Sequence, residues 1–206
     1  RLREFLIAAS RQSRSEMRSS MKIGILAVQG AFAEHEQMLE QLGAEYIELR
    51  KGEDVRQSYD GLILPGGEST VQGKLMRELD MFDTIQSQIK NGMPVLATCA
   101  GAILLAQQLS NDAATHLATI PAVVRRNAYG RQLGSFSVDE QIEGIGTFPM
   151  RFIRAPYIEK VLDDTKVLAK VDGNIVMVEN KNQLAMSFHP ELTSDTRIHE
   201  MFLKKI

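Results

Sequence analysis

Short apolar runs alternate with helical patterns through residues 22–109, and this alternation constrains the fold more than any other feature of the chain. Residues 32–42 carry apolar side chains at helical spacing, and Gly43 after them is typical of a helix end. A second helical stretch, expected in two pieces, covers residues 71–90. The expected strands are residues 22–28, 46–49, 59–64 and 93–98. The pattern predicts parallel strands joined by right-handed crossovers, with helices on both faces of the sheet.

The second half of the chain is dominated by strand patterns. Asp172-Gly173 lies between two apolar runs and is typical of a hairpin turn. A closing helix is expected over residues 194–204, with Ser194 or Asp195 as its N-cap and a buried stripe of Ile198, Met201 and Phe202. The expected strands are residues 122–124, 133–138, 147–153, 166–171, 174–178 and 183–187. We therefore predict an α/β fold of three layers, with a mostly parallel mixed sheet between flanking helices.

Residues 1–20 differ in composition from the rest, with five arginines and two glutamates. Met21 then opens a clean strand pattern. We interpret residues 1–20 as a leader or upstream extension outside the fold, and residues 21–206 as a single domain. An Arg- and Ser-rich, acid-poor segment is also typical of an organellar transit peptide, which is the alternative interpretation.

Composition excludes several classes of function. The formal net charge of −2 argues against a general nucleic-acid-binding protein. No apolar run approaches the ~20 residues that a membrane-spanning helix needs, so no membrane contact is expected. The single cysteine rules out an intramolecular disulfide framework. We expect a cytoplasmic protein without a metal site.

The single cysteine, Cys99, stands between an apolar run and a helical pattern over residues 102–109. Ala100 and Gly101 after it are small enough for a sharp turn and leave room for a substrate. A thiol at such a strand–helix turn faces the positive end of the helix, which favours the thiolate. The alternative is a buried cysteine that acts only as a small hydrophobic side chain.

Two further loops are expected at the same edge of the sheet, where parallel strands end and ligands usually bind. Gln29-Gly30 follows the first strand, and residues 65–70 (PGGEST) follow the third. The two glycines of the latter allow backbone N–H groups to approach an anion closely. Alone, this segment could be an ordinary glycine turn in which Ser69 or Thr70 caps a helix.

A thiol nucleophile needs a base, and His189 is the best placed of the four histidines because it ends an apolar strand. Pro190 favours an extended backbone at His189, so Glu191, two residues on, can bring its carboxylate beside the imidazole. Such a carboxylate fixes the tautomer and stabilises the imidazolium. His35 is expected to pack in the core, whereas His116 and His199 are expected in solvent. We predict the triad Cys99, His189 and Glu191.

Several segments together resemble the class I (triad) glutamine amidotransferases, and within them the glutaminase subunits of pyridoxal 5′-phosphate synthase. The resemblance covers nearly all of residues 21–206. One departure is Ala97, where the family usually has glycine. The segments are ILAVQGA (25–31), GLILPGGEST (61–70), TCAG (98–101), RNAYGRQ (126–132), FIRAP (152–156) and SFHPELT (187–193).

The resemblance implies the flavodoxin-like fold of that class and hydrolysis of L-glutamine to glutamate and ammonia through a cysteine thioester. Cys99 would attack the side-chain amide, His189 would move the proton, and Glu191 would orient His189. Backbone N–H groups of Gly67 and Ala100 would form the oxyanion hole. The implied contacts to L-glutamine are Gly67, Glu68, Ser69, Arg126, Ile153 and Arg154.

The resemblance also implies a partner, the (β/α)8-barrel synthase subunit, in a large multimeric complex. That subunit would receive the ammonia and make pyridoxal 5′-phosphate, which is thus a product and not a cofactor of this chain. Poor activity of the chain alone is expected until the partner orders the loop around Gly66 and Gly67. Two alternatives remain: another cysteine hydrolase of this fold, such as a γ-glutamyl hydrolase or peptidase, and a non-catalytic docking subunit.

Overall fold

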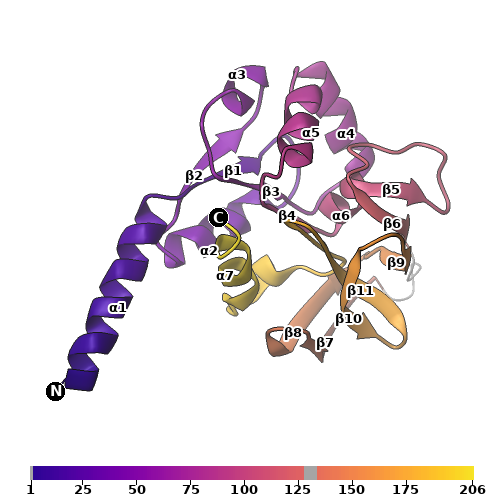
Figure 1. Ribbon diagram of the computed structural model, residues 1–206. Helices are drawn as coiled ribbons and strands as arrows, with labels where there is room; N and C mark the ends of the chain where they lie inside the picture. The colour runs from indigo at the N-terminus through magenta and orange to yellow at the C-terminus, as the bar shows by residue number, and fades with distance from the viewer. Residues whose placement is uncertain (1, 128–133) are drawn as a thin grey trace.

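The computed structural model describes residues 2–127 and 134–206 (Figure 1). Leu133 of the predicted strand 133–138, and residues 128–132 of the RNAYGRQ segment, lie outside the described residues. The helices are α1 Leu2–Ser19, α2 Phe32–Gln41, α3 Gly52–Val55, α4 Ser69–Glu78, α5 Phe82–Lys90, α6 Ala100–Leu105 and α7 Arg197–Leu203, with a 3-10 turn at Pro190–Leu192. The strands are β1 Lys22–Leu26, β2 Glu45–Leu49, β3 Gly61–Leu64, β4 Val95–Thr98, β5 Ala106–Leu109, β6 Ile120–Arg125, β7 Ser135–Ile142, β8 Gly146–Ile153, β9 Tyr157–Val161, β10 Lys166–Val171, β11 Asn174–Asn180 and β12 Gln183–Met186.

The main sheet has the strand order β2-β1-β3-β4-β12-β11-β9-β6-β5, and β10 pairs with β11. From β2 to β12 every pairing is parallel, whereas β12 and β10 each pair with β11 in antiparallel fashion. Strands β7 and β8 form a separate antiparallel ribbon. The predicted α/β class with a mixed sheet is confirmed.

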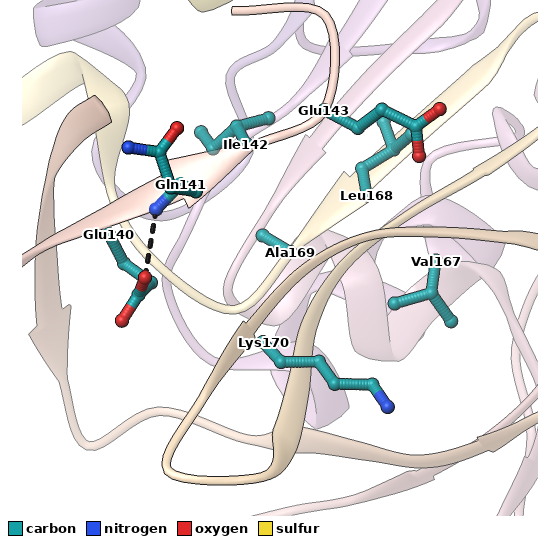
Figure 2. A pocket seen from close by; sticks show the side chains of 8 residues that line it. All are labelled: Glu140, Gln141, Ile142, Glu143, Val167, Leu168, Ala169 and Lys170. Carbon is teal, nitrogen blue, oxygen red and sulfur yellow. Dashed lines mark hydrogen bonds between the residues drawn. The ribbon is translucent and has the colours of Figure 1, made fainter. Parts of the chain in front are cut away.

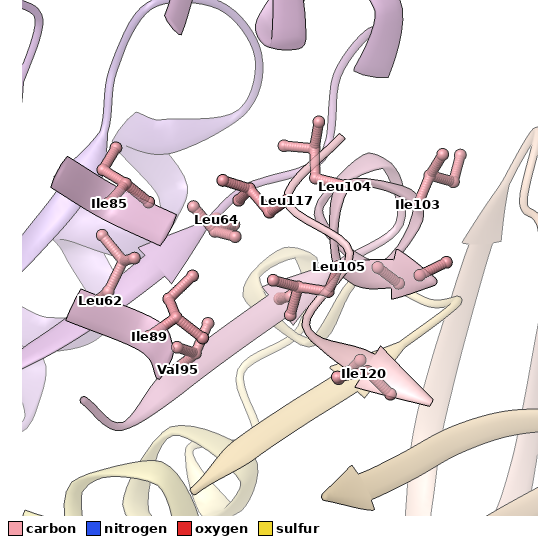
Figure 3. Packing of buried hydrophobic residues seen from close by; sticks show 14 of the residues in the cluster. Leu62, Leu64, Ile85, Ile89, Val95, Ile103, Leu104, Leu105, Leu117 and Ile120 are labelled. Carbon is pink, nitrogen blue, oxygen red and sulfur yellow. The ribbon is translucent and has the colours of Figure 1, made fainter. Parts of the chain in front are cut away.

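Successive residues of the central strands point to opposite faces of the sheet, and each face carries its own hydrophobic core. Leu62 and Leu64 of β3 pack with the residues of α5 and α6 on one face (Figure 3). Ile63 between them packs on the other face, against α2, α7 and the β7–β8 ribbon. Because both faces are covered, the central strands are apolar throughout rather than alternating, and the molecule has three layers.

Several elements differ from the sequence-based expectation. The predicted helix 102–109 ends at Leu105, and Ala106–Leu109 continues as strand β5 beside β6. Strand β9 and the short helix α3 have no counterpart among the predicted elements. In the closing helix Thr196, and not Ser194 or Asp195, occupies the N-cap position, but its side chain makes no capping hydrogen bond, and Asp195 accepts one from the Arg197 N–H at 3.1 Å. In its stripe Ile198 and Phe202 are fully buried as predicted, but Met201 is only partly buried.

Residues 2–19 form one helix, α1, that extends away from the rest of the molecule (Figure 1). No residue of α1 is buried. Arg18 near its end pairs with Glu200 of α7 at 3.2 Å. The assignment of residues 1–20 to a segment outside the fold stays a prediction. Within the described residues, no helix combines the length and the apolar character that crossing a membrane requires.

Candidate active site

The three predicted loops meet at the carboxyl edge of the parallel strands. The Cys99 N–H donates to the Met186 carbonyl at 2.8 Å, which ties the end of β4 to the end of β12. The Ala31 N–H donates to the Gly66 carbonyl at 3.0 Å, which ties the loop after β1 to the loop after β3. The sheet topology therefore brings Gln29-Gly30, Pro65-Gly66-Gly67 and Cys99 together, as the strand pattern predicted.

Cys99 stands at a sharp turn between β4 and α6, with φ of +51° and ψ of −106°. This left-handed conformation is unfavourable for a side chain larger than glycine, and it persists only where the surroundings enforce it. Close packing of α6 against β3 holds Cys99 in this conformation: a Cβ added at Gly101 would lie 2.1 Å from the Leu64 carbonyl oxygen. The turn presses α6 onto the end of β3 and presents the thiol at the sheet edge with 7% of the residue exposed.

His189 lies between the thiol and a carboxylate. Its backbone N–H donates to the Arg151 carbonyl of β8 at 2.8 Å. Its Nδ1–H donates to Glu191 Oε1 at 2.5 Å, and both side chains are buried. Burial alone would lower the pKa of His189, but hydrogen bonds to Cys99 and Glu191 and their negative charge raise it to about 10. The imidazolium is thus the favoured form, and the His189 ring and Cys99 Cβ both lie beside Gly66. The catalytic roles of Cys99, His189 and Glu191 remain predictions.

The loop at residues 65–68 is held from the side of β1. The Glu68 N–H donates to Gln29 Oε1 at 2.8 Å, and the Gln72 amide donates to the carbonyls of Gln29 and Pro65. Gly67 has φ of +156°, and an added Cβ there would lie 2.3 Å from Gln29 Oε1. Only glycine fits this position. The roles of Gly67 and Ala100, the first residue of α6, in an oxyanion hole remain predictions.

The predicted contacts to glutamine lie at different parts of this edge. The Ile153 carbonyl, at the end of β8, is 3.9 Å from Cys99 Sγ. Arg154 follows with φ of +44° and an exposed side chain. Glu68 is exposed, and Ser69 is buried at the start of α4. Arg126 forms an ion pair with Asp112 at 2.9 Å. The structure therefore brings Ile153 to the thiol, and the substrate contacts of the whole set remain predictions.

Two buried histidines behind the triad were not predicted as part of the site. His35 packs in the core as expected, but its Nε2 also lies 3.3 Å from Thr98 Oγ1 and 3.6 Å from Glu191 Oε2. His199 is fully buried 2.9 Å from His35, so the expectation that His199 is in solvent was wrong. Its position one turn from Phe202 and Leu203, on the apolar side of α7, could have indicated burial.

The methyl group of Ala97 fits behind the cysteine turn. Ala97 is fully buried in β4, between Leu64 of β3 and Ala185 of β12, and belongs to the core on the α6 face. A methyl group there fills space between sheet and helix and does not enter the edge where the thiol lies.

An open hollow of about 430 Å³ lies elsewhere, between the end of β7 and β10 (Figure 2). Its lining, which includes Glu140, Glu143 and Lys170, contains none of the predicted site residues. Within residues 2–127 and 134–206, no group of three or more His, Cys, Asp or Glu side chains is arranged to hold a metal ion.

Comparison with known proteins places this geometry in a family. Residues 25–206 match the SNO glutamine amidotransferase family. A protein of Desulfitobacterium hafniense (strain DSM 10664 / DCB-2), named pyridoxal 5′-phosphate synthase subunit PdxT, is 62% identical over 186 residues, covering 90% of this chain and 94% of that protein. The protein of the same name from Streptococcus pneumoniae (strain CGSP14) is 52% identical over 187 residues, covering 89% and 96%.

Solved structures agree with the sequence relatives. A crystal structure of a glutamine amidotransferase superposes with a TM-score of 0.84 at 43% identity, covering 89% of this chain and 97% of that one. PurLQS from Thermotoga maritima gives a TM-score of 0.63 at 17% identity, covering 89% and 98%, and so shares the fold. The chain therefore belongs to the SNO glutamine amidotransferase family.

Proposed function

We propose that this chain hydrolyses L-glutamine to L-glutamate and ammonia through Cys99, as the glutaminase subunit of a pyridoxal 5′-phosphate synthase. One observation carries the proposal: His189 bonds to Glu191 at 2.5 Å, and the His189 ring and Cys99 Cβ both border Gly66, where an added Cβ would lie 2.4 Å from the ring and 3.5 Å from Cys99 Cβ. The strained turn at Cys99 and the raised pKa of His189 are both features that activate a thiol for nucleophilic attack.

The chemistry follows from the order of these groups. His189 takes the thiol proton, the Cys99 sulfur attacks the side-chain amide carbon, and the carbonyl electrons move onto oxygen, where the Gly67 and Ala100 N–H groups would stabilise them. When the C–N bond breaks, the His189 imidazolium protonates the nitrogen, ammonia leaves and a thioester remains. Water then attacks the thioester, His189 takes its proton and returns it to sulfur, and glutamate is released. Glu191 keeps the imidazole aligned in both halves.

Several substrate contacts belong to the same proposal. Glu68, Ser69, Ile153 and Arg154 would bind glutamine beside the thiol. Arg126 would bind the glutamine α-carboxylate, for which a planar guanidinium is well suited because it donates two parallel hydrogen bonds. Its present ion pair with Asp112 would then break or be shared when substrate binds.

Ammonia is the product that a partner must collect before it escapes into water. The relatives from D. hafniense and S. pneumoniae are named subunits of pyridoxal 5′-phosphate synthase. We propose that the partner here is the (β/α)8-barrel synthase subunit in a large multimer, and that the chain works in the cytoplasm without a cofactor of its own. Docking of the partner would order Gly66 and Gly67 and raise the glutaminase rate.

The test measures glutamate release by the purified chain, with and without the synthase subunit, for the wild type, Cys99→Ala and His189→Asn. We expect activity only where both side chains are intact, and stoichiometric labelling of Cys99 by a glutamine-mimicking electrophile. Cys99-independent activity, or no labelling even with the synthase present, would refute the proposed site. Labelling without glutamine-dependent formation of pyridoxal 5′-phosphate in the presence of the synthase would refute the partner and favour another cysteine hydrolase.

A further inference from the structure

The carboxylate of Glu191 faces imidazoles on two sides. Its Oε1 accepts the hydrogen bond from His189, whereas its Oε2 lies 3.6 Å from Nε2 of His35 on α2. The Glu191 side chain is fully buried, and Oε2 has no hydrogen-bond partner within 3.5 Å among the described residues. A buried carboxylate oxygen without a donor is costly, which makes the nearest N–H significant.

The His35 ring is itself held from behind. His199 Nε2 lies 2.9 Å from His35 Nδ1, so one of these two nitrogens must carry the hydrogen and the other must accept it. Burial is the largest factor that lowers the pKa of both rings, so both are neutral and each carries one N–H. If His199 donates to His35 Nδ1, the remaining hydrogen of His35 is on Nε2, which faces Thr98 and Glu191.

In this pair of tautomers His199 Nε2–H points to His35 Nδ1, and His35 Nε2–H points to Glu191. If His35 Nδ1–H donated to His199 Nε2 instead, His35 Nε2 would carry a lone pair that faces the Glu191 carboxylate oxygen, and the two would repel. The charge on Glu191 therefore selects the first pattern.

We propose that His35 and His199 are positioning residues for the triad: His199 fixes the tautomer and orientation of His35, and His35 donates to Glu191 Oε2 and so fixes the carboxylate that orients His189. The contact is long at 3.6 Å, and a shift of about half an ångström by His35 would bring it to hydrogen-bond length. This inference rests on the proposed triad.

The titratable groups around this line are few. Glu191 faces His189 from its own turn and His35 from α2. His35 faces His199 of α7, and His189 adds a repulsive charge that further lowers the pKa of His35. His189 in turn faces Cys99. Loss of the His35 donor should therefore act on the alkaline limb of the rate profile, which reports the pKa of His189.

The experiment compares His35→Leu with His35→Gln in the presence of the synthase subunit. Glutamine keeps an N–H donor near the position of Nε2, whereas leucine removes it at similar size. We expect His35→Leu to lower kcat for glutamate release roughly tenfold with little change in KM, the low end for a supporting residue that acts through its neighbours. It should also move the alkaline limb to lower pH, and His35→Gln should restore most of both losses.

His199→Leu and His199→Gln form the second pair, with the same direction and a smaller effect. Leu39→Val is the matched control, because Leu39 lies one turn from His35 on α2 and is equally buried, but it contacts neither imidazole through a polar atom. If His35→Leu changes stability like Leu39→Val and leaves kcat and the pH profile unchanged, His35 is only a packing residue and the inference fails. That result is distinct from a failure of the triad, in which Cys99→Ala itself would keep activity.

Discussion

A methyl group at Gly101 tests how the cysteine turn is built. Gly101 is the second residue of α6, and an ideal Cβ there would lie 2.1 Å from the Leu64 carbonyl oxygen of β3. Real Cβ atoms essentially never approach a heavy atom closer than 3.0 Å. Since the obstacle is backbone on both sides, α6 and β3 must separate by about 0.9 Å, the difference between these two distances.

The size of the effect follows from that separation. Overpacking of a well-packed site costs about 1–3 kcal/mol, and the intrinsic helix preference of alanine over glycine returns about 1 kcal/mol. The net loss of stability for Gly101→Ala is then about 0–2 kcal/mol. Catalysis should suffer more, because a displacement of about 1 Å in a reacting group costs on the order of 100-fold in rate.

The matched control is Gly73→Ala in α4. An added Cβ there would lie 2.2 Å from the His116 ring, a side chain that can rotate away. Glutamate release with the synthase subunit, together with urea unfolding, distinguishes the two variants. We expect Gly101→Ala to lose kcat about 100-fold and Gly73→Ala to retain it. Equal kcat for the two variants would refute the claim that packing of α6 on β3 sets the position of the thiol.

Cys99 and, after it, Glu191 raise the pKa of His189 to about 10; Glu191→Gln removes the Glu191 charge, so the alkaline limb of kcat/KM should move to lower pH. The raised pKa of His189 also stabilises the folded state; this contribution is complete below the ordinary histidine pKa of 6.5 and is lost as pH rises through about 10. In urea unfolding, the wild type should therefore lose more stability than Glu191→Gln between pH 6 and 10. Arg126→Lys should raise KM for glutamine and leave kcat nearly unchanged, because a bidentate clamp is lost. Removal of residues 1–20 should change the free energy of unfolding by less than about 1 kcal/mol, since α1 buries no residue and its ion pair with Glu200 is only partly buried.

Each of these outcomes has a clear opposite. An unchanged alkaline limb in Glu191→Gln would mean that His189 is not the group titrating there. A fall in kcat without a change in KM for Arg126→Lys would place Arg126 outside substrate binding. A large loss of stability on removing residues 1–20, measured on urea unfolding curves, would place α1 inside the fold.

The central parallel strands β1, β3 and β4 could be predicted because they are buried on both faces and are predominantly apolar. The second half was harder. Strand β5 was assigned to a helix because residues 106–109 include alanine, glutamine and leucine, which all favour helix. Residues 106–109 form a strand because they pair with β6. This pairing partner lies farther along the chain, so the local sequence pattern does not reveal it. Strand β9 carries charged residues on an exposed side and gives a weak signal.

In the site, too, contacts between residues close in sequence could be predicted, and contacts between residues far apart in sequence could not. The relation of His189 to Glu191 depends on two residues of backbone, and sequence was enough to predict it. The approach of His35 and His199 depends on how α2 and α7 pack on one face of the sheet, which spacing along either helix does not specify. His199 was therefore misplaced in solvent although its own helix buries it.

The alignment of the site depends on the β7–β8 ribbon, whereas the folding of the main sheet does not. Strand β8 accepts the His189 N–H at Arg151 and directs its Ile153 carbonyl toward the Cys99 sulfur. A two-stranded ribbon is weak by itself, and this one is held through Phe148 and Phe152 in the core. Local opening of the ribbon would release the base while the ten-stranded sheet stays folded. The lifetime of the aligned site is thus set by the ribbon and can be much shorter than that of the fold.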